Sequence, residues 1–258
     1  ALPGENFNTV LYAGNGGGST DAITGVGFQP DLNWIKGRTN ATSNYLTDSV
    51  RGIAGSGLLS DSSAASDGIE RIASLDSDGF TTAGTLYSYV NTSSANYVAW
   101  NWKAGGAPTA TNSGGQTPTS GSVMIDGSAS TASLAAADIY PTKMSINTTS
   151  GFSIVSYTSP GATSDKTIPH GLPQTPDMVI IKNLDSTFNW DVWGPDLQSG
   201  YDLRLNTDDA ETASRWSTTD PSASLITLKD TYEVNGTDDY IAYCFHSVEG
   251  YSKVGSYT

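Results

Sequence analysis

The sequence predicts an all-β protein made of two tandem, homologous β-sandwich domains of a jelly-roll or lectin-like kind, joined by a Gly/Pro/Thr-rich linker. Two observations predict this. Short apolar runs rich in Val, Ile, Tyr, Trp and Thr are separated by turn residues, and stretches that favour long helices are absent. In addition, the first and last parts of the 258-residue chain repeat each other, which favours two similar domains over one large one.

The repeat is clearest in two short stretches. "QPDLNWIKGR" at 29–38 and "TPDMVIIKNL" at 175–184 share Pro-Asp, an apolar residue and Ile-Lys. Their surroundings agree as well, because "FNTVLY" and "FSIVSY" precede them, and "NYVAWNWK" and "DYIAYCFH" follow them. We therefore call residues 7–103 copy one and residues 152–246 copy two. A period of about 145 residues is too long for a solenoid and suits tandem domains.

The repeat and the composition divide the chain into four segments. We expect a β-sandwich over residues 1–105, a linker with short strand and helix elements over 106–150, and a second β-sandwich over 151–250. After an uncharged Gly/Pro/Thr/Ser-rich run, "SVMIDG" and "KMSIN" predict strands and "ASLAAADIY" predicts a helical turn or two. Residues 251–258 resemble the opening strand of copy two and predict the start of a third copy. We expect this strand to pair with a sheet.

Alternating apolar residues bounded by Gly, Pro, Asn and Asp place the strands. Copy one is predicted to have strands near 7–13, 22–28, 31–37, 44–50, 72–82 and 96–103. Copy two is predicted to have strands near 152–158, 166–169, 177–183, 189–193, 201–205, 224–229 and 239–246. The expected equivalent pairs are Phe7 and Phe152, Tyr12 and Tyr157, Pro30 and Pro176, and Trp100 and Tyr243.

The last strand of each copy has one row of large side chains and one row of smaller or polar ones, because successive side chains point to opposite faces. We expect the bulky rows to form the sandwich cores, since large apolar side chains usually bury. The alternative is an exposed platform for stacking sugars. The bulky rows are Val98, Trp100 and Trp102 in copy one and Ile241, Tyr243 and Phe245 in copy two.

Charge and cysteine content exclude several classes of protein. The net charge is −14 and Lys and Arg form no cluster, so neither nucleic acid nor anionic lipid is an expected partner. The single cysteine, Cys244, allows no intrachain disulfide and no cysteine-based zinc site. No run of eighteen apolar residues occurs, so no membrane insertion is expected. Because the sequence begins at Ala1, we expect a processed product or a part of a longer protein.

The repeat also gives an internal comparison for catalytic residues. His170 corresponds to Val26, and His246 corresponds to Lys103, so the shared fold requires neither histidine. No Gly-x-Ser-x-Gly turn and no oriented Cys-His pair occurs. We therefore predict no catalytic residue and no enzyme.

Carboxylates are numerous enough to need their own interpretation. Asp76 and Asp78 could flank a sugar as in glycosidases, but Asp before Gly79 is typical of a turn, which we favour. Acidic loops could also hold calcium, yet none has EF-hand spacing, so we predict no cofactor. These loops contain Asp208, Asp209 and Glu211, and Asp230, Glu233, Asp238 and Asp239.

Aromatic residues in connecting segments of copy two give the candidate binding site. If the strand near them alternates with Trp190 inward, Trp193 points outward. Aromatic rings beside polar groups hold sugars by stacking and hydrogen bonds. The alternative is that the rings cap the ends of the sandwich. The candidate glycan-binding residues are Trp190, Trp193, Tyr201, Arg204 and Trp216.

Strings spanning nearly the whole chain resemble a repeated domain of marine bacteriophage structural proteins. They include "ENFNTVLYAGNG", "ITGVGFQPDLNWIK", "YVAWNWKAGG", "HGLPQTPDMVIIKN" and "YIAYCFHSVEGYSKVGSYT". In that family the domain resembles a module of tail-fibre or receptor-binding proteins. The resemblance therefore implies a non-enzymatic virion protein, exposed at the virion surface, with a role in host attachment.

The resemblance also implies partners. It implies other virion proteins and a homo-oligomer, with the trimer as the common form of phage fibres, and host-surface glycan as the ligand. Two alternatives stay open. One is a purely structural capsid or tail decoration protein, and the other is a glycan-degrading tailspike with a lectin-like sandwich.

Overall fold

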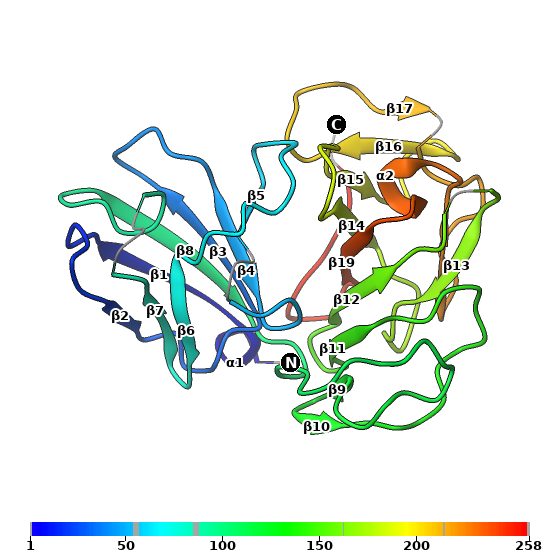
Figure 1. Cartoon of the computed structure of the whole chain (residues 1–258), viewed down its shortest axis with the longest axis horizontal. Coiled ribbons are helices and arrows are strands. Elements are labelled where there is room, and N and C mark those ends of the chain that lie inside the picture. The colour runs from blue at the N-terminus through cyan, green and yellow to red at the C-terminus, as the bar shows by residue number, and fades with distance from the viewer. Residues whose placement is uncertain (1, 54–56, 85–87, 162, 214, 257–258) are drawn as a thin grey trace.

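The computed structural model describes residues 2–53, 57–84, 88–161, 163–213 and 215–256. The chain is nearly all β, and each copy packs one large sheet against one small sheet (Figure 1). The large sheets of the two copies lie next to each other in the middle of the molecule and share an apolar cluster. The predicted fold class, an all-β tandem of sandwiches, is confirmed.

Copy one begins with a single helical turn, α1 (Pro3–Asn6), and its strands divide between two sheets. The large sheet has the strand order β1-β8-β3-β4-β5, and the small sheet has the order β2-β7-β6. The strands are β1 (Phe7–Ala13), β2 (Asp21–Thr24), β3 (Leu32–Gly37), β4 (Tyr45–Asp48), β5 (Leu58–Leu59), β6 (Ile72–Asp76), β7 (Gly79–Thr82) and β8 (Asn96–Trp102).

Copy two repeats this plan with a longer large sheet. Its order is β10-β9-β11-β12-β19-β14-β15-β16-β17, and its small sheet pairs β13 with β18. The strands are β9 (Val123–Ile125), β10 (Ser128–Ala129), β11 (Lys143–Asn147), β12 (Phe152–Thr158), β13 (Lys166–Pro169), β14 (Met178–Asn183), β15 (Asp191–Trp193), β16 (Tyr201–Arg204), β17 (Thr212–Ala213), β18 (Leu225–Leu228) and β19 (Asp239–Phe245). A helical turn, α2 (Tyr232–Asn235), precedes β19, and no helix in the described ranges is long and apolar enough to cross a membrane.

The predicted strands are confirmed, except that one of them is divided in copy one, and the short strands β5 and β17 were not predicted. The segment 72–82 is a hairpin of β6 and β7 rather than one strand. Asp78 lies in its turn and accepts hydrogen bonds from the backbone N–H groups of Gly25 and Gly27 at 3.1 and 2.6 Å. The turn interpretation of this carboxylate is therefore confirmed.

The short strands of the segment 106–150 join the large sheet of copy two. β11 pairs antiparallel with β12, and β9 pairs parallel with β11, as the strand predictions for this segment require. The helical turn expected at 132–140 is wrong. Its backbone groups bond to a neighbouring loop and to β13 instead, with the Leu134 N–H donating to the Gln116 carbonyl and the Ile139 N–H donating to the Thr167 carbonyl.

The strand expected at 251–258 is also wrong over the described residues 251–256. Ser252 makes one isolated bridge to Val248, and the segment joins no sheet. A turn at 249–251 folds it back on its own chain.

Strand registers place the two copies on matching positions. Tyr12 stacks on Tyr97 with ring centroids 5.1 Å apart, and Tyr157 stacks on Tyr240 with centroids 5.0 Å apart. The residue pairs of β1 with β8 recur one for one in β12 with β19. The equivalences predicted from the repeat are therefore confirmed.

The recurring Pro-Asp and Ile-Lys residues tie the large sheet to its loops. Asp31 accepts a hydrogen bond of 2.7 Å from the backbone N–H two residues past the end of β8. Asp177 accepts one of 2.6 Å from the backbone N–H two residues past the end of β19. Lys36 and Lys182 donate to backbone carbonyls of the loops that follow their strands. In each copy, the Asp of the motif therefore holds the segment after the last strand, and the Lys holds the loop after its own strand.

Each copy has its own core between its two sheets. We call the face of a large sheet that meets its own small sheet the inner face, and the opposite face the outer face. In copy one, Tyr97 and Ala99 of the inner face pack against Ile72 and Phe80 of the small sheet, all 0% exposed. The matching core of copy two includes Tyr240, Ala242, Cys244, Ile168 and Ile226.

The prediction that the bulky rows fill these cores is wrong. Trp100 and Trp102 lie on the outer face of copy one and are half-buried, because the smaller row faces inward. In copy two Ile241 and Tyr243 are buried, but they pack against copy one rather than against their own small sheet.

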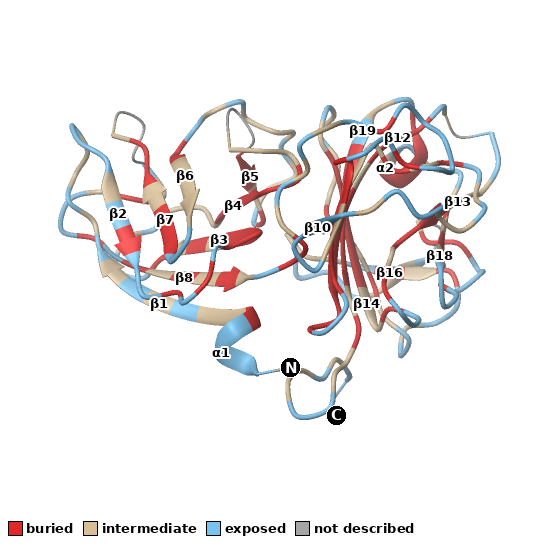
Figure 2. Ribbon diagram, turned by 90° about the horizontal axis from the view of Figure 1, so that it is seen from below, coloured by how far each residue is buried: buried red, intermediate tan, exposed pale blue. Residues whose placement is uncertain are grey.

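A third apolar core joins the two copies through their outer faces. Its members include Leu32, Leu46 and Leu58 from copy one and Phe152, Ile154, Ile180, Trp190, Ile241 and Tyr243 from copy two. The ring of Trp102 meets that of its equivalent, Phe245, with centroids 6.5 Å apart. Contact between equivalent residues is characteristic of an approximate two-fold arrangement. The contact does not cover the two sheets equally: in Figure 2 the central strands of the large sheet of copy two are mostly buried, whereas β1 of copy one has no buried residue.

Candidate functional site

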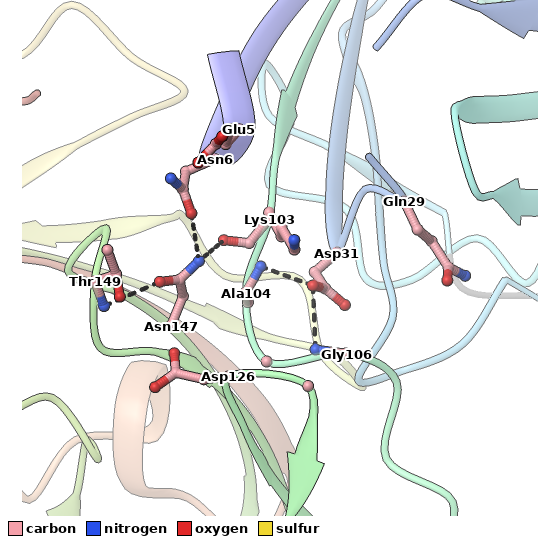
Figure 3. A pocket seen from close by; sticks show the side chains of 12 residues that line it. Glu5, Asn6, Gln29, Asp31, Lys103, Ala104, Gly106, Asp126, Asn147 and Thr149 are labelled. Atoms are coloured by element: carbon pink, nitrogen blue, oxygen red, sulfur yellow. Dashed lines mark hydrogen bonds between the residues drawn. The ribbon is translucent and has the colours of Figure 1, made fainter. Parts of the chain in front are cut away.

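A polar hollow of about 500 Å³ lies where α1, the end of β8 and the segment before β12 meet (Figure 3). Asp31 accepts hydrogen bonds from the N–H groups of Ala104 and Gly106 at 2.7 and 3.2 Å. Burial raises the pKa of this carboxyl, and these hydrogen bonds oppose that rise. Asn147 donates to the side chain of Asn6 at 2.9 Å. Because these polar groups hydrogen-bond to one another, we interpret the hollow as a structural contact that fixes how the two copies meet.

An apolar cavity of about 190 Å³ lies deeper between the outer faces. The Tyr243 hydroxyl beside this cavity is already hydrogen-bonded, because it donates to Asp48 at 2.7 Å. Such a cavity offers water few partners. It is lined by Leu32, Trp34, Leu46, Trp102, Met178, Ile180, Trp190, Leu205, Tyr243 and Phe245.

A mixed pocket of about 420 Å³ adjoins this cavity, and Trp34 and Leu205 line both. We call it the Trp34 pocket. Trp34 reaches it because alternation along β3 turns Trp34 to the outer face, where it is half-buried at the margin of the junction. Both copies contribute to the lining, which is Trp34, Asn44, Ser60, Asp61, Leu205, Asn206, Thr207 and Asp208.

Two buried polar atoms of the Trp34 pocket have no hydrogen-bond partner within the described part of the chain. Ser60 is 2% exposed, and its hydroxyl is unpartnered. The side-chain oxygen of Asn44 is likewise buried and unpartnered. Leaving such a group unsatisfied costs about 1–3 kcal/mol. Both oxygens are shielded from solvent, so a polar ligand reaches them only when the side chains around them move aside.

Carboxylates give the Trp34 pocket its charge. Asp61 and Asp208 are exposed at its rim, and Asp61 also accepts the Asn44 backbone N–H at 3.0 Å. None of the described residues that line the pocket is a Lys, Arg or His. The pocket therefore combines an indole wall, unpartnered oxygen atoms and negative charge.

The three tryptophans among the predicted site residues of copy two are buried. Trp190, Trp193 and Trp216 are 0%, 5% and 2% exposed. The expectation that Trp193 points outward is wrong, because it pairs with Val179 of the inner face and stacks on Trp216 with centroids 6.2 Å apart. Trp190 points the other way, into the junction, and lines the apolar cavity beside the Trp34 pocket.

Tyr201 and Arg204 lie on β16 and are half-buried. Arg204 reaches Asp209 at 3.4 Å, across the turn that follows its strand. The five candidate residues therefore divide between two faces of copy two and do not share one surface.

Reasoning from the sequence missed Trp34, Asn44 and Ser60. A signal was present in the repeat, because Asn44 stands where copy two has Trp190. A large residue exchanged for a small one at matching positions indicates a hollow in one copy.

Copy two also buries a pair of carboxyl groups that copy one lacks. Asp191 and Asp202 are both 0% exposed, and the equivalent positions in copy one are Tyr45 and Gly57. Burial, and then the neighbouring Asp202, raise the pKa of Asp191, and burial raises the pKa of Asp202. Among the residues described, no group of three or more His, Cys, Asp or Glu side chains is arranged to hold a metal ion.

The histidines hold local structure. Burial, with a smaller contribution from His246, lowers the pKa of His170 to about 4. The ring of His170 accepts the Leu172 N–H at 3.1 Å and contacts the Ser222 carbonyl at 3.2 Å.

Comparison with known proteins identifies a family. A family model described as a domain of unknown function (DUF7483) matches residues 2–135 and again residues 126–258. The two matches agree with the tandem repeat, and they overlap around β10, which belongs to the sheet of copy two. No curated protein and no solved structure matches the chain.

Proposed function

This chain belongs to the DUF7483 family as two tandem units, and from that premise and the Trp34 pocket we propose that it is a non-enzymatic glycan-binding module. Its proposed setting is a bacteriophage virion. There it forms part of a tail fibre or receptor-binding protein, exposed at the virion surface, that contacts glycans of the host. Its proposed partners are other virion proteins and further copies of itself, as a trimer.

The observation that supports glycan binding is the position of half-buried Trp34 beside the unpartnered oxygens of Ser60 and Asn44. A sugar ring has an apolar face that stacks on an indole, and hydroxyl groups around its edge that seek hydrogen-bond partners. The Trp34 pocket offers both kinds of contact within about 420 Å³.

A second candidate function has its own observation. Asp61 and Asp208 line the same pocket, and two carboxylates across a sugar are the groups a glycoside hydrolase uses. Release of new reducing ends from host polysaccharide, lost in Asp208→Asn, would favour a glycan-degrading tailspike over a binding module.

A glycan array tests the proposal with a matched pair of variants. Trp34→Ala removes the indole wall of the pocket. Trp100→Ala removes a half-buried indole on the same outer face that contacts Trp34 but does not line the pocket. We expect Trp34→Ala to lose the glycans that the wild type binds and Trp100→Ala to weaken their binding less. A wild-type protein that binds no host-surface glycan would favour a purely structural capsid or tail decoration protein.

A further inference from the structure

The Trp34 pocket has a filled counterpart in the same junction. Asn44 stands directly before β4, and Trp190 stands directly before β15, and these strands pair with β3 and β14 in the same register. By the same registers, residues 60–63 after β5 correspond to residues 205–208 after β16. The approximate two-fold arrangement brings each of these positions against the other copy.

In one half of the junction the position is occupied by an indole. Trp190 of copy two is 0% exposed, and its ring N–H donates to the carbonyls of Leu59 and Ser62 in copy one at 3.0 and 3.2 Å. Its ring also stacks on Tyr243 with centroids 6.4 Å apart. One flat ring with an edge donor therefore fills this half.

In the other half, Asn44 of copy one shares a pocket with residues 205–208 of copy two, and its short side chain leaves about 420 Å³ open. We propose that this open half takes one sugar ring in place of the missing indole, and that the ring is neutral or carries an amine but is not anionic. This inference rests on the proposed glycan-binding function and adds the class of sugar.

The lining supplies the recognition. The apolar face of the ring packs on Trp34 and Leu205, and its hydroxyls bond to the unpartnered oxygens of Ser60 and Asn44. Asp61 and Asp208 accept further hydroxyl or ammonium protons, since ionised carboxylates act only as acceptors. A uronate, sulfate or phosphate would instead meet two like charges, with no cation among the described lining residues to offset them.

The first experiment fills the pocket. Asn44→Trp places in copy one the side chain that copy two already carries, and Asn44→Ala is its control.

The probes are methyl β-glucoside, methyl β-glucosaminide and methyl β-glucuronide, with the matching galactosides. Binding is followed by the NMR shift of the Trp34 indole N–H. We expect Asn44→Trp to weaken binding of the neutral and amino glycosides by at least about tenfold, and Asn44→Ala to weaken it less. Ser60→Leu, which installs the residue found at the equivalent position 205, is a second block should Asn44→Trp fail to fold.

The outcomes separate this inference from the function on which it rests. The inference is supported if the protein binds the neutral glycoside at least about tenfold more tightly than the glucuronide. The double variant Asp61→Asn, Asp208→Asn should reduce this ratio of affinities. Equal, Trp34-dependent binding of the glucuronide would overturn the charge selection and leave glycan binding intact. Neutral binding unaffected by both blocking variants would overturn the assignment of the pocket. Glycan binding that does not depend on Trp34 would likewise overturn the assignment of the pocket, whereas no binding of any probe or array glycan would overturn the proposed function itself.

Discussion

The hydroxyl of Tyr243 in copy two donates a 2.7 Å hydrogen bond to the carboxylate of Asp48 in copy one. Both residues are at most 1% exposed, and Asp48 also accepts a 2.6 Å bond from Arg51. The bond therefore links a buried charge of one copy to the outer face of the other, and it requires the two faces to stay in contact.

Tyr243→Phe should destabilise the chain by about 1–3 kcal/mol, because a carboxylate oxygen loses a buried donor while ring packing is kept. Urea denaturation measures this loss. Tyr12→Phe is the matched control, since its hydroxyl bond to Val90 at 2.7 Å lies within copy one. If the junction matters as described, Tyr243→Phe should also speed proteolysis between the copies, and Tyr12→Phe should not. Equal cleavage of the two variants would contradict this role.

Trp100→Ala should cost less than the about 3–5 kcal/mol typical of a fully buried Trp, because Trp100 is half-buried and meets Trp34 edge to face at 6.3 Å. Phe80→Ala should cost about 3–5 kcal/mol, because Phe80 is 0% exposed in the inner core. Thermal or urea unfolding of the two variants compares them. A larger loss for Trp100→Ala would contradict the assignment of the two faces.

The buried carboxyl pair predicts a stability that falls as pH rises. Burial raises the pKa of Asp191 and of Asp202, so the folded chain binds more protons than the unfolded chain above the ordinary carboxyl pKa of about 4. The stability contribution is full below that value and is lost as pH rises through the folded-state pKa. The loss is about 1.4 kcal/mol per pH unit for each proton of difference.

Asp191→Asn removes one of these titrations. The free energy of unfolding, measured in urea from acidic to neutral pH, should fall less steeply for this variant than for the wild type. Asp138→Asn is the control, because hydrogen bonds from Thr167 lower the pKa of this exposed carboxyl. Identical slopes for Asp191→Asn and the wild type would show that the pair is ionised in the folded chain.

Asp31→Ala should destabilise the chain more than Asp177→Ala. Asp31 is 3% exposed and accepts bonds from Ser49, Ala104 and Gly106, so its loss leaves several donors unsatisfied at about 1–3 kcal/mol in total. Asp177 accepts only the Ser247 N–H among the side-chain hydrogen bonds of the described chain. Urea midpoints at equal slope decide the order. A larger loss of stability for Asp177→Ala than for Asp31→Ala would contradict the role of Asp31 in holding the contact between the two copies.

The sequence was sufficient for the strands and the repeat, because both follow from local alternation and from matching strings. It was insufficient to predict which face of each large sheet lies against the small sheet of its own copy. In β8 both rows carry large apolar side chains, Tyr97 in one and Trp100 in the other, so burial preference alone could not choose. The choice depends on the second copy, which covers the outer face, and that contact joins residues far apart in the chain.

The candidate site was less predictable for a similar reason. Trp190 and Trp193 both looked like loop aromatics, yet one fills the junction and the other the inner core. Nothing local to Trp34, Asn44 or Ser60 marks them. Their pocket exists only where the turn after β16 of copy two comes against copy one.

The pairing of outer faces also limits how many copies a chain can carry with its apolar surface covered. A two-fold contact is self-complementary and closes after two members, whereas a head-to-tail contact can continue without limit. Copy one and copy two complete each other in this sense, as the meeting of Trp102 with Phe245 indicates. In a longer array the copies would cover one another's outer faces in pairs. An odd number would leave one aromatic face open to a neighbouring chain, so the parity of the copy number would decide whether the array is self-contained.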